Sequence, residues 1–584
     1  MSKKLNDRNS AVSRRRFLGS VAAGATLPSA VQQAAHAATG ISGWDAITDV
    51  VVVGSGAGAL SAAISASQLG GKVIVLEKST VAGGTTAKST GGIWTPNSHL
   101  LRAQGTVDKR EDAIRYMVRL SFPEHYDPEH PQFGATEAGY AMIATFYDEV
   151  APTVESLVNL GALNVTNILA PRNVLMPDYF AHLPECRVTK GRIMFPMNED
   201  GSFGGGAAMI RGLARVAASR GVSIELGQRV DAAVQDASGR VVGVTVHGED
   251  GITQRIGARK GVVFATGGFT HNVEMCRQFL KGPIYGGCAV PSAEGDFVGI
   301  GTAAGARLGN MQNAWWVQIP LEESIAVRSV ATGIWCSPGD SMIQVNRLGH
   351  RFFDEKFVYN ERTQAHFVWD AMTGTYPNLI SILIYDERTA REYAGFPPIP
   401  PAGSAPTSAM RADTLEGLAK IVNERFAALA EHTGALALDQ QFVPNLRESI
   451  TRFNGFARSG EDQEFGRGSV PIDRYFHQYG PRAVDNPMPN LTMHPLADQG
   501  PYYAILMAPG TLDTKGGPQT DPQARVLDNA GQPIPGLYGA GNCVASPTGP
   551  GYWGGGATLG PALTFGRIAG RNAHRAAATE FSDV

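Results

Sequence analysis

Residues 50–77 hold the pattern that most restricts how this chain can fold. The β-branched run Val50–Val53 is typical of a buried parallel strand, and it leads into the turn Gly54-Ser55-Gly56-Ala57-Gly58-Ala59. A small-residue helix is predicted over 60–69 and a second strand over 72–76, ending at Glu77. A strand, a glycine turn, a helix, a strand and an acid within about thirty residues indicate a dinucleotide-binding unit. We therefore predict an α/β fold with a Rossmann-like domain.

Each position in this unit has a physical role. Gly54 permits the tight turn, Gly56 lets a pyrophosphate approach the backbone, and Ala59 lets the helix pack against the strand. The helix N-terminus offers amide donors to the phosphates, and Glu77 is placed to accept hydrogen bonds from a ribose. The residues of the unit that we predict to bind the cofactor are Gly54, Ser55, Gly56, Ala57, Ala59, Glu77 and Lys78.

Three later glycine turns favour FAD over a nicotinamide. One follows Glu77 at 83–86, one follows a predicted strand at 261–264, and one follows a predicted strand near the C-terminus at 536–542. Turns so far apart in sequence can converge on one extended molecule, and FAD has that length. The further residues predicted to contact FAD are Gly84, Thr85, Thr86, Val230, Thr266, Gly267, Gly541, Asn542, Thr558 and Leu559.

A second dinucleotide unit is not evident in the sequence. Gly204-Gly205-Gly206 opens a predicted helix but follows no β-branched run, so we interpret it as a packing or cofactor contact. The chain then lacks its own nicotinamide site. Its electrons are expected to pass between an organic substrate and an external acceptor, a quinone or similar carrier.

Composition excludes several other classes of partner. The net charge of -3 over 584 residues gives no electrostatic reason to expect nucleic acid or acidic lipid. The five cysteines contain no C-x-x-C pair, so no structural metal site is expected. The length predicts two large domains, or one domain split by an insertion.

The first forty residues have the features of an export signal. Ser13-Arg14-Arg15-Arg16-Phe17-Leu18 precedes an apolar stretch and then Ala35-His36-Ala37, as in a twin-arginine signal with an A-x-A cleavage site. The apolar stretch is shorter than the ~20 residues of a spanning helix, so no stable membrane span is expected. We predict a periplasmic or extracytoplasmic protein; a disordered basic arm is the alternative.

Longer stretches of the sequence resemble a known family. Residues 45–578 resemble the fumarate reductase/succinate dehydrogenase flavoprotein superfamily and, within it, the 3-ketosteroid dehydrogenases, the Δ1-dehydrogenases more than the Δ4-(5α) ones. Beside the glycine turns, the resemblance is carried by Arg351-Phe352-Phe353-Asp354-Glu355 with Tyr359, Phe465-Gly466-Arg467-Gly468 with Asp473-Arg474-Tyr475, Pro501-Tyr502-Tyr503-Ala504 running to Thr514-Lys515-Gly516-Gly517, and 551–562, which contains Tyr552-Trp553-Gly554-Gly555-Gly556.

The resemblance implies a discontinuous architecture. The FAD-binding domain would comprise residues 45–312 and 497–584. An inserted α+β catalytic domain would comprise residues 313–496.

The resemblance also implies a reaction and its residues. In 1,2-desaturation of a 3-ketosteroid, a base removes the C2 proton and flavin N5 takes hydride from C1. Tyr552 and the Gly556 amide match the carbonyl-binding pair, Tyr359 matches the base, and Tyr179 matches the tyrosine that supports it, with Tyr475 and Tyr503 as competitors. Because free tyrosine has a pKa near 10, a tyrosine base would need its pKa depressed by a hydrogen-bonded neighbour or by a nearby positive dipole. The family pattern has proline at the positions of Trp553 and Gly555, which leaves the Δ1 or Δ4 position of attack open.

Three alternative functions are consistent with parts of the sequence. They are a Δ4-(5α)-ketosteroid dehydrogenase, a fumarate reductase-like enzyme and a non-catalytic exported flavin electron carrier. A dicarboxylate site needs cationic side chains, whereas Thr514-Lys515 rather than His-Thr precedes Gly516-Gly517. The set of candidate tyrosines favours an enzyme over a carrier.

Overall fold

The computed structural model describes residues 43–169, 173–404, 408–478 and 484–581. The predicted export signal in residues 1–40 lies outside the described residues.

An eight-stranded sheet contains the predicted dinucleotide unit. Strand β1 pairs in parallel with β2 on one side and β11 on the other, and β11 pairs in parallel with β20. The predicted strands thus form one layer, with their carboxyl ends at the same edge. The strands of this sheet are β1 (Ala46–Val53), β2 (Val73–Leu76), β8 (Ser223–Glu225), β9 (Gln228–Gln235), β10 (Val241–Gly248), β11 (Thr253–Phe264), β19 (Arg525–Leu527) and β20 (Pro533–Gly539).

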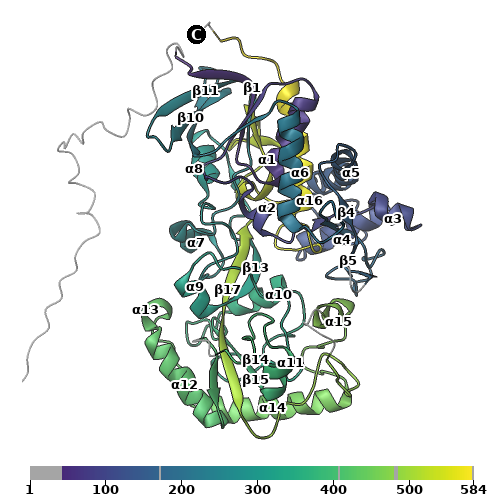
Figure 1. Cartoon of the computed structure of the whole chain (residues 1–584), viewed down its shortest axis with the longest axis vertical. Helices are drawn as coiled ribbons and strands as arrows, with labels where there is room; N and C mark the ends of the chain where they lie inside the picture. Colours follow the sequence, from purple (N-terminus) through teal and green to yellow (C-terminus); the bar gives the residue numbers. More distant parts are fainter. Residues whose placement is uncertain (1–42, 170–172, 405–407, 479–483, 582–584) are drawn as a thin grey trace, which may run out of the picture. The chain divides into compact units, whose positions relative to one another are not determined.

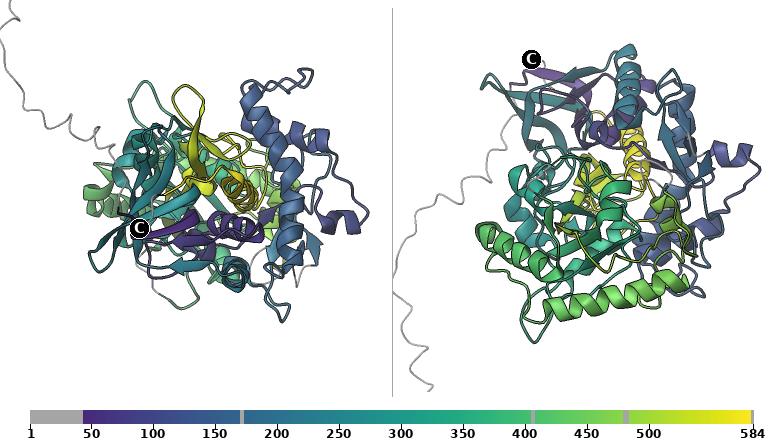
Figure 2. Two further views of the ribbon diagram at one scale, coloured as in Figure 1. Left: turned by 90° about the horizontal axis from the view of Figure 1, so that it is seen from above. Right: turned by 60° about the horizontal axis from the view of Figure 1, so that its bottom comes forward.

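Helices α1 (Ala57–Gln68), α6 (Gly205–Ser219) and α16 (Leu559–Arg575) pack together beside this sheet (Figures 1 and 2). Their close approach depends on small residues: a Cβ on Gly566 of α16 would lie 2.2 Å from the carbonyl oxygen of Gly58. The C-terminal helix is therefore fixed against the first glycine turn, although 500 residues separate them in sequence. Gly206 of α6 has a packing role, since its Cβ would lie 1.8 Å from the oxygen of Thr86 in α2 (Gly84–Lys88).

A second, five-stranded sheet contains most strands of the segment between β11 and β19. The long strand β17 pairs antiparallel with β13, β15 and β16. Helix α12 packs on β16 and β17, and α14 packs on α12 (Figures 1 and 2). The elements concerned are β13 (Ala314–Pro320), β14 (Met342–Val345), β15 (Ser381–Asp386), β16 (Met410–Ala412), β17 (Tyr502–Thr514), α12 (Leu415–Ala428) and α14 (Phe442–Ser459).

The chain is therefore a mixed α/β protein with a Rossmann-like sheet, as predicted. The remaining elements are the helices α3 (His99–Ala103), α4 (Arg110–Ser121), α5 (Glu137–Asn159), α7 (Val273–Phe279), α8 (Asp296–Ala303), α9 (Leu321–Ala326), α10 (Tyr359–Gln364), α11 (Glu387–Glu392), α13 (Ala430–Thr433) and α15 (Pro471–His477), and the short strands β3 (Ile93–Trp94), β4 (Val165–Thr166), β5 (Ile168–Leu169), β6 (Val174–Leu175), β7 (Ile193–Pro196), β12 (Leu308–Gly309) and β18 (Gly517–Pro518).

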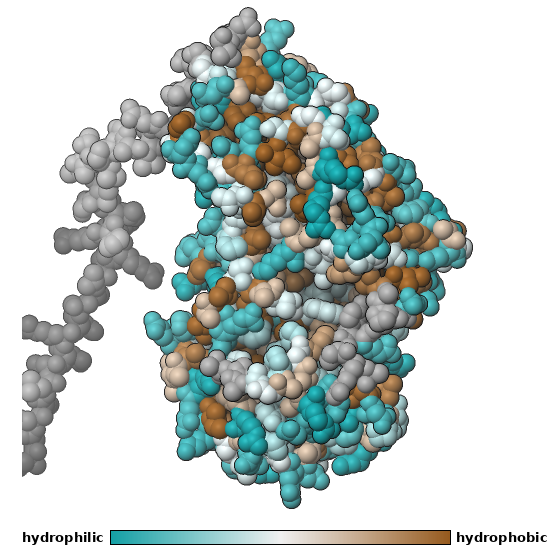
Figure 3. Space-filling view, viewed as in Figure 1, coloured by the Kyte–Doolittle hydropathy of each residue, from teal (hydrophilic) through white to brown (hydrophobic). Residues whose placement is uncertain are grey.

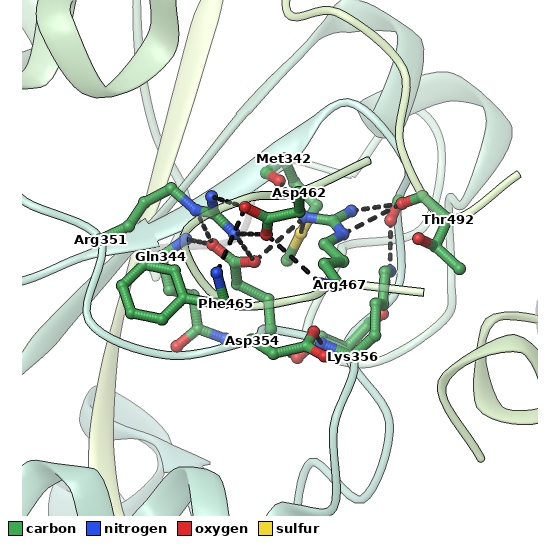
Figure 4. Close-up of polar contacts among 12 residues, drawn as sticks. Met342, Gln344, Arg351, Asp354, Lys356, Asp462, Phe465, Arg467 and Thr492 are labelled. Carbon is green, nitrogen blue, oxygen red and sulfur yellow. Dashed lines mark hydrogen bonds and ion pairs between the residues drawn. The ribbon is translucent and has the colours of Figure 1, made fainter. Parts of the chain in front are cut away.

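A buried cluster of charges fixes the segment that leads into α10 (Figure 4). Arg351 donates to Glu355 over 2.8 and 2.9 Å and to Asp462 over 2.8 Å, and Arg467 lies 3.3 Å from Glu355. Burial alone would raise the pKa of Glu355, but Arg351 and then Arg467 hold it at about 2. The ion pairs thus hold two distant segments together and set the start of α10, where Tyr359 is the first residue.

Hydrophilic and hydrophobic residues are mixed over the face shown in Figure 3. Within the described ranges, none of the helices has both the length and the apolar character needed to cross a membrane.

We expect Glu355→Gln to lower the free energy of unfolding by about 3 kcal/mol or more, because removing one partner leaves buried guanidinium groups underpaired. The folded-state pKa of Glu355 lies below the unfolded value, so its contribution is present above the unfolded pKa and is lost as pH falls towards about 2. Denaturant unfolding at several pH values should show the two proteins converging under acidic conditions. Glu416→Gln, in an exposed pair with Arg447, is the control and should leave the unfolding midpoint unchanged.

Candidate active site

A cavity opens at the carboxyl edge of the parallel strands, with about 880 Å³ of empty space when the part open to solvent is included. All the predicted FAD-binding residues except Ala59 line it: Gly54, Ser55, Gly56, Ala57, Glu77, Lys78, Gly84, Thr85, Thr86, Val230, Thr266, Gly267, Gly541, Asn542, Thr558 and Leu559. Ala59 is fully buried within α1. The predicted turns therefore meet around one elongated space.

The first turn is built around Gly54. Its φ is +100°, and a Cβ there would lie 2.4 Å from the carbonyl oxygen of Ala265, so a side chain is disfavoured on both counts. Glu77 at the end of β2 accepts from Ser55 Oγ at 2.6 Å, and the same hydroxyl accepts from the Gly83 amide at 2.8 Å. These bonds hold the glycine-threonine turn of 83–86 over the first turn.

Lys78 takes part in ion pairs at the rim of the cavity. Its Nζ lies 2.9 Å from Glu294 and 2.6 Å from Asp296, which itself lines the cavity. Glu294 and Asp296 were not predicted as site residues, because their approach to Lys78 depends on how α8 packs beside β9.

The polar chemistry of the cavity fits an extended dinucleotide. Thr266 Oγ1 is buried and has no hydrogen-bond partner among the described residues, although it lines the cavity. A buried hydroxyl without a partner is costly, which indicates that a ligand completes it. The first turn of α16 reaches the same cavity through Thr558, Leu559 and Ala562, where its dipole favours negative charge.

Three tyrosines from distant segments meet beside this cavity. The hydroxyls of Tyr179 and Tyr359 lie 2.8 Å apart, and Tyr552 packs edge-on against both rings, with centroids 5.2 and 5.7 Å away. The Tyr552 hydroxyl lies 3.2 Å from Thr558 Oγ1, which lines the cavity. Of the two competitors, Tyr503 lies elsewhere: it stacks on Tyr385 and donates to Glu387. Tyr475 is buried beside Phe476, with ring centroids 6.4 Å apart.

Burial raises the pKa of Tyr359 well above its ordinary value, and the neighbouring Tyr179 and Tyr552 raise it further. The protein's own side chains therefore do not supply the depressed pKa that a tyrosine base would need, because loss of hydration dominates. Burial also raises the pKa of Tyr552, although hydrogen bonds with Thr558, Tyr359 and the backbone of Gly556 act in the opposite direction and lower it. A raised pKa keeps Tyr552 protonated, as a donor must be.

Gly556 adopts a conformation that only glycine tolerates well. Its φ is +90°, and a Cβ would lie 2.5 Å from the backbone of Gly92. Its carbonyl oxygen accepts from the Trp94 amide at 3.1 Å. The turn is thus fixed on β3 beside Tyr552.

The two departures from the family pattern have different structural effects. The Trp553 ring is fully buried against Trp94 and Phe146 and donates to Ser121 Oγ at 2.9 Å, so it anchors the loop away from the tyrosines. A Cβ on Gly555 would instead lie 2.7 Å from Ile193 and 3.3 Å from the Tyr179 hydroxyl. Only the second departure touches the tyrosine cluster.

A buried polar chain that the sequence did not reveal lies behind Tyr179. Asp178 accepts from Trp94 Nε1 at 2.8 Å and from Arg192 at 2.6 Å, and Arg192 also pairs with Asp108 at 2.6 Å. Burial raises the pKa of Asp178, and Arg192 opposes the shift. The network fixes the backbone on which Tyr179 stands.

Two aromatic neighbours of the tyrosines were also missed. Trp315 on β13 lies 4.7 Å from the Tyr552 ring, and Phe476 on α15 lies 6.0 Å from the Tyr179 ring. Both come from the segment containing the second sheet. Their only signal in the sequence was its general richness in aromatic residues.

Comparison with known proteins identifies the class first. The model of the family described as "FAD binding domain" matches residues 49–559, so the chain belongs to that family and binds FAD. Among curated relatives, the 4-oxocyclohexanecarboxylate 2-dehydrogenase of Sinomonas cyclohexanicum is 31% identical over 558 residues, covering 90% of this chain and 92% of that protein. The 3-oxosteroid 1-dehydrogenase of Mycolicibacterium smegmatis is 31% identical, covering 89% and 96%.

A solved structure agrees with these relatives. The 3-ketosteroid Δ1-dehydrogenase of Sterolibacterium denitrificans, in complex with 1,4-androstadiene-3,17-dione, is similar with a TM-score of 0.75 and 27% identity, covering 91% of this chain and 99% of that one. Within the FAD-binding family, the chain thus belongs with the 3-ketosteroid dehydrogenase-like flavoproteins, as its sequence predicted. It is an FAD-dependent oxidoreductase.

We expect Gly54→Ala to raise the Kd for FAD by at least about tenfold, or about 1.4 kcal/mol, because the methyl group meets Ala265 and the left-handed backbone is strained. Retained flavin absorbance after gel filtration measures this effect. Gly70→Ala is the matched control, since Gly70 also has a positive φ of +87° but has open space around it. Equal FAD retention in both variants would contradict the role of Gly54.

Proposed function

We propose that this chain catalyses 1,2-desaturation of a 3-ketosteroid and passes the electrons to an external acceptor such as a quinone. The observation that carries the proposal is the meeting of the Tyr179, Tyr359 and Tyr552 side chains at the edge of the FAD cavity. A base, its supporting hydroxyl and a carbonyl donor would have to lie close together in this way. The bound flavin supplies the hydride acceptor for C1.

The protein's own residues supply the proton chemistry. The Tyr552 hydroxyl and the Gly556 amide would donate to the ketone oxygen and so stabilise the charge that develops there when C2 loses its proton. Tyr359, once it has lost its own proton, would accept the C2 proton, with its oxygen held by the Tyr179 hydroxyl. Because the pKa of Tyr359 is raised, activation of C2–H by the bound ketone is an essential part of this step.

The surroundings of the tyrosines support an apolar cyclic ketone as the substrate class. Trp315 and Phe476 contact Tyr552 and Tyr179 through their rings, and Met176 and Ile193 lie against Gly555. Aromatic and aliphatic walls suit a flat, fused-ring ketone. The Sinomonas relative is named for a smaller ring ketone that bears a carboxylate, so a panel of substrates should contain both kinds.

Two further expectations belong to the proposal. The FAD-binding domain would comprise residues 45–312 and 497–584, and the catalytic domain residues 313–496. Strand β17 links the two domains, because it pairs with β13 and β15 while Asp513, near its end, lines the FAD cavity. The signal in residues 1–40 would export the folded protein.

We expect Tyr359→Phe and Tyr552→Phe each to keep bound FAD but to slow anaerobic bleaching of the flavin by about 100-fold or more, since each loses one hydroxyl that acts on the ketone. Stopped-flow absorbance with 4-androstene-3,17-dione measures the rate, and product analysis distinguishes Δ1 from Δ4-(5α) desaturation. In the unmodified protein the rate should rise with pH in the alkaline range, as more Tyr359 loses its proton. Tyr503→Phe, remote from the cluster, is the control. Normal bleaching in either variant removes that tyrosine from the site.

We expect residues 1–40 to export a folded reporter across the inner membrane. The matched control replaces the paired arginines, Arg14→Lys with Arg15→Lys, which should retain the reporter in the cytoplasm. Fractionation measures both. Equal export of the two fusions would contradict a twin-arginine route.

A further inference from the structure

Lys515 is a fully buried lysine at the end of β17. Its Nζ donates to the carbonyl oxygen of Gly551 at 2.8 Å and to Thr548 Oγ1 at 3.2 Å. Gly551 directly precedes Tyr552. The ammonium group therefore binds the backbone at the residue before the proposed carbonyl donor.

The Lys515 side chain is also linked to Tyr552 indirectly, through the ring of Trp315. Its Nζ lies 4.2 Å from the centre of the Trp315 ring, and the Trp315 ring lies 4.7 Å from that of Tyr552. The far side of the indole is fixed by a 3.0 Å hydrogen bond from Nε1 to Asn542, which lines the FAD cavity. Lys515, Trp315 and Tyr552 thus form a packed series, and the first and last members are also joined through Gly551.

The electrostatic surroundings connect Lys515 to the helix of Tyr359. Burial lowers the pKa of Lys515 well below its ordinary value, and the main opposing charge is Glu361, two residues after Tyr359 in α10. Hydrogen bonds from Asn360 at 2.7 Å and Gln364 at 2.8 Å hold the Glu361 carboxyl group. Burying an amine in this way is unfavourable unless its donors are used, which favours a specific role over simple filling of space.

We propose that Lys515 is a positioning residue for Tyr552, which it orients towards the ketone by binding the Gly551 carbonyl and the face of Trp315. The inference rests on the proposed function, because that function makes the Tyr552 hydroxyl a hydrogen-bond donor to the ketone oxygen of the substrate. Lys515 does not itself touch the substrate. Its effect is on proton removal at C2, because a displaced donor stabilises the developing oxyanion poorly.

The test isolates the proton step from the redox step. Enzyme whose flavin has been reduced beforehand is mixed with 4-androstene-3,17-dione in D₂O, and deuterium entering C2 is followed by mass spectrometry. The C2–H bond breaks, its proton passes to the protein, and a solvent deuteron returns to the same carbon, so no electrons leave the ketone.

We expect Lys515→Met to slow this exchange by about 100-fold, the effect of displacing a reacting group by about 1 Å, while the Kd for the steroid and the FAD content change little. A purely structural role would instead lower the FAD content, the melting temperature and the affinity for the steroid together. Lys515→Gln, which retains an amide donor without the charge, is the variant to use if Lys515→Met does not fold. We expect it to lose the same share of the exchange rate.

Thr548→Val is the matched control, because it removes one partner of Lys515 and leaves the contacts with Gly551 and Trp315. It should retain most of the exchange rate. The inference is overturned if the unmodified protein exchanges and the Lys515 variants exchange equally fast, or if Thr548→Val loses as much as Lys515→Met. If the unmodified protein neither exchanges nor bleaches with any ketone, the proposed function itself is wrong.

Discussion

The 2.8 Å contact between the hydroxyls of Tyr179 and Tyr359 joins two segments 180 residues apart, and much of the structure serves to make it possible. Tyr179 stands on a backbone fixed by Asp178 and Arg192, whereas Tyr359 begins a helix whose approach is fixed by the Arg351–Glu355 pair. Both supports are buried ion pairs, which are strongly directional when fully satisfied. Each tyrosine is thus placed by a buried polar network in the adjoining segment.

Tyr552 is positioned by a different kind of constraint. Its loop is rich in glycine, and Trp553 anchors it by filling a pocket beside Trp94 while Gly556 turns back onto β3. A glycine loop has little stiffness of its own, so its geometry depends on these anchors. The cofactor edge and the carbonyl donor are therefore fixed by one short stretch, which explains why the resemblance to known dehydrogenases is most specific there.

The sequence predicted the parts of the site that depend on local pattern. The strand, turn and helix at Val50–Gln68 follow from periodicity and glycine spacing, and the cavity-lining turns were found for the same reason. Asp178, Trp315 and Lys515 were not predicted as site residues, because their roles depend on contacts made only in the folded chain, such as those of Asp178 with Trp94 and of Lys515 with Trp315. The sequence also did not indicate the raised pKa of Tyr359, since the extent of burial around this residue is a property of the whole fold.

Burial has opposite consequences for the two tyrosines that we propose to act on the ketone. For Tyr552, a raised pKa maintains the proton that it would donate; for Tyr359, the same shift opposes loss of its own proton. Proton removal then has to be driven chiefly from the carbonyl side, where charge develops on the oxygen within reach of Tyr552 and Gly556. In such a site the rate depends more on how accurately the donor is aimed than on the strength of the base. This dependence is the reason why a lysine that does not meet the substrate can matter: by holding Gly551 and Trp315, Lys515 would fix the donor that activates C2–H when little of Tyr359 is deprotonated.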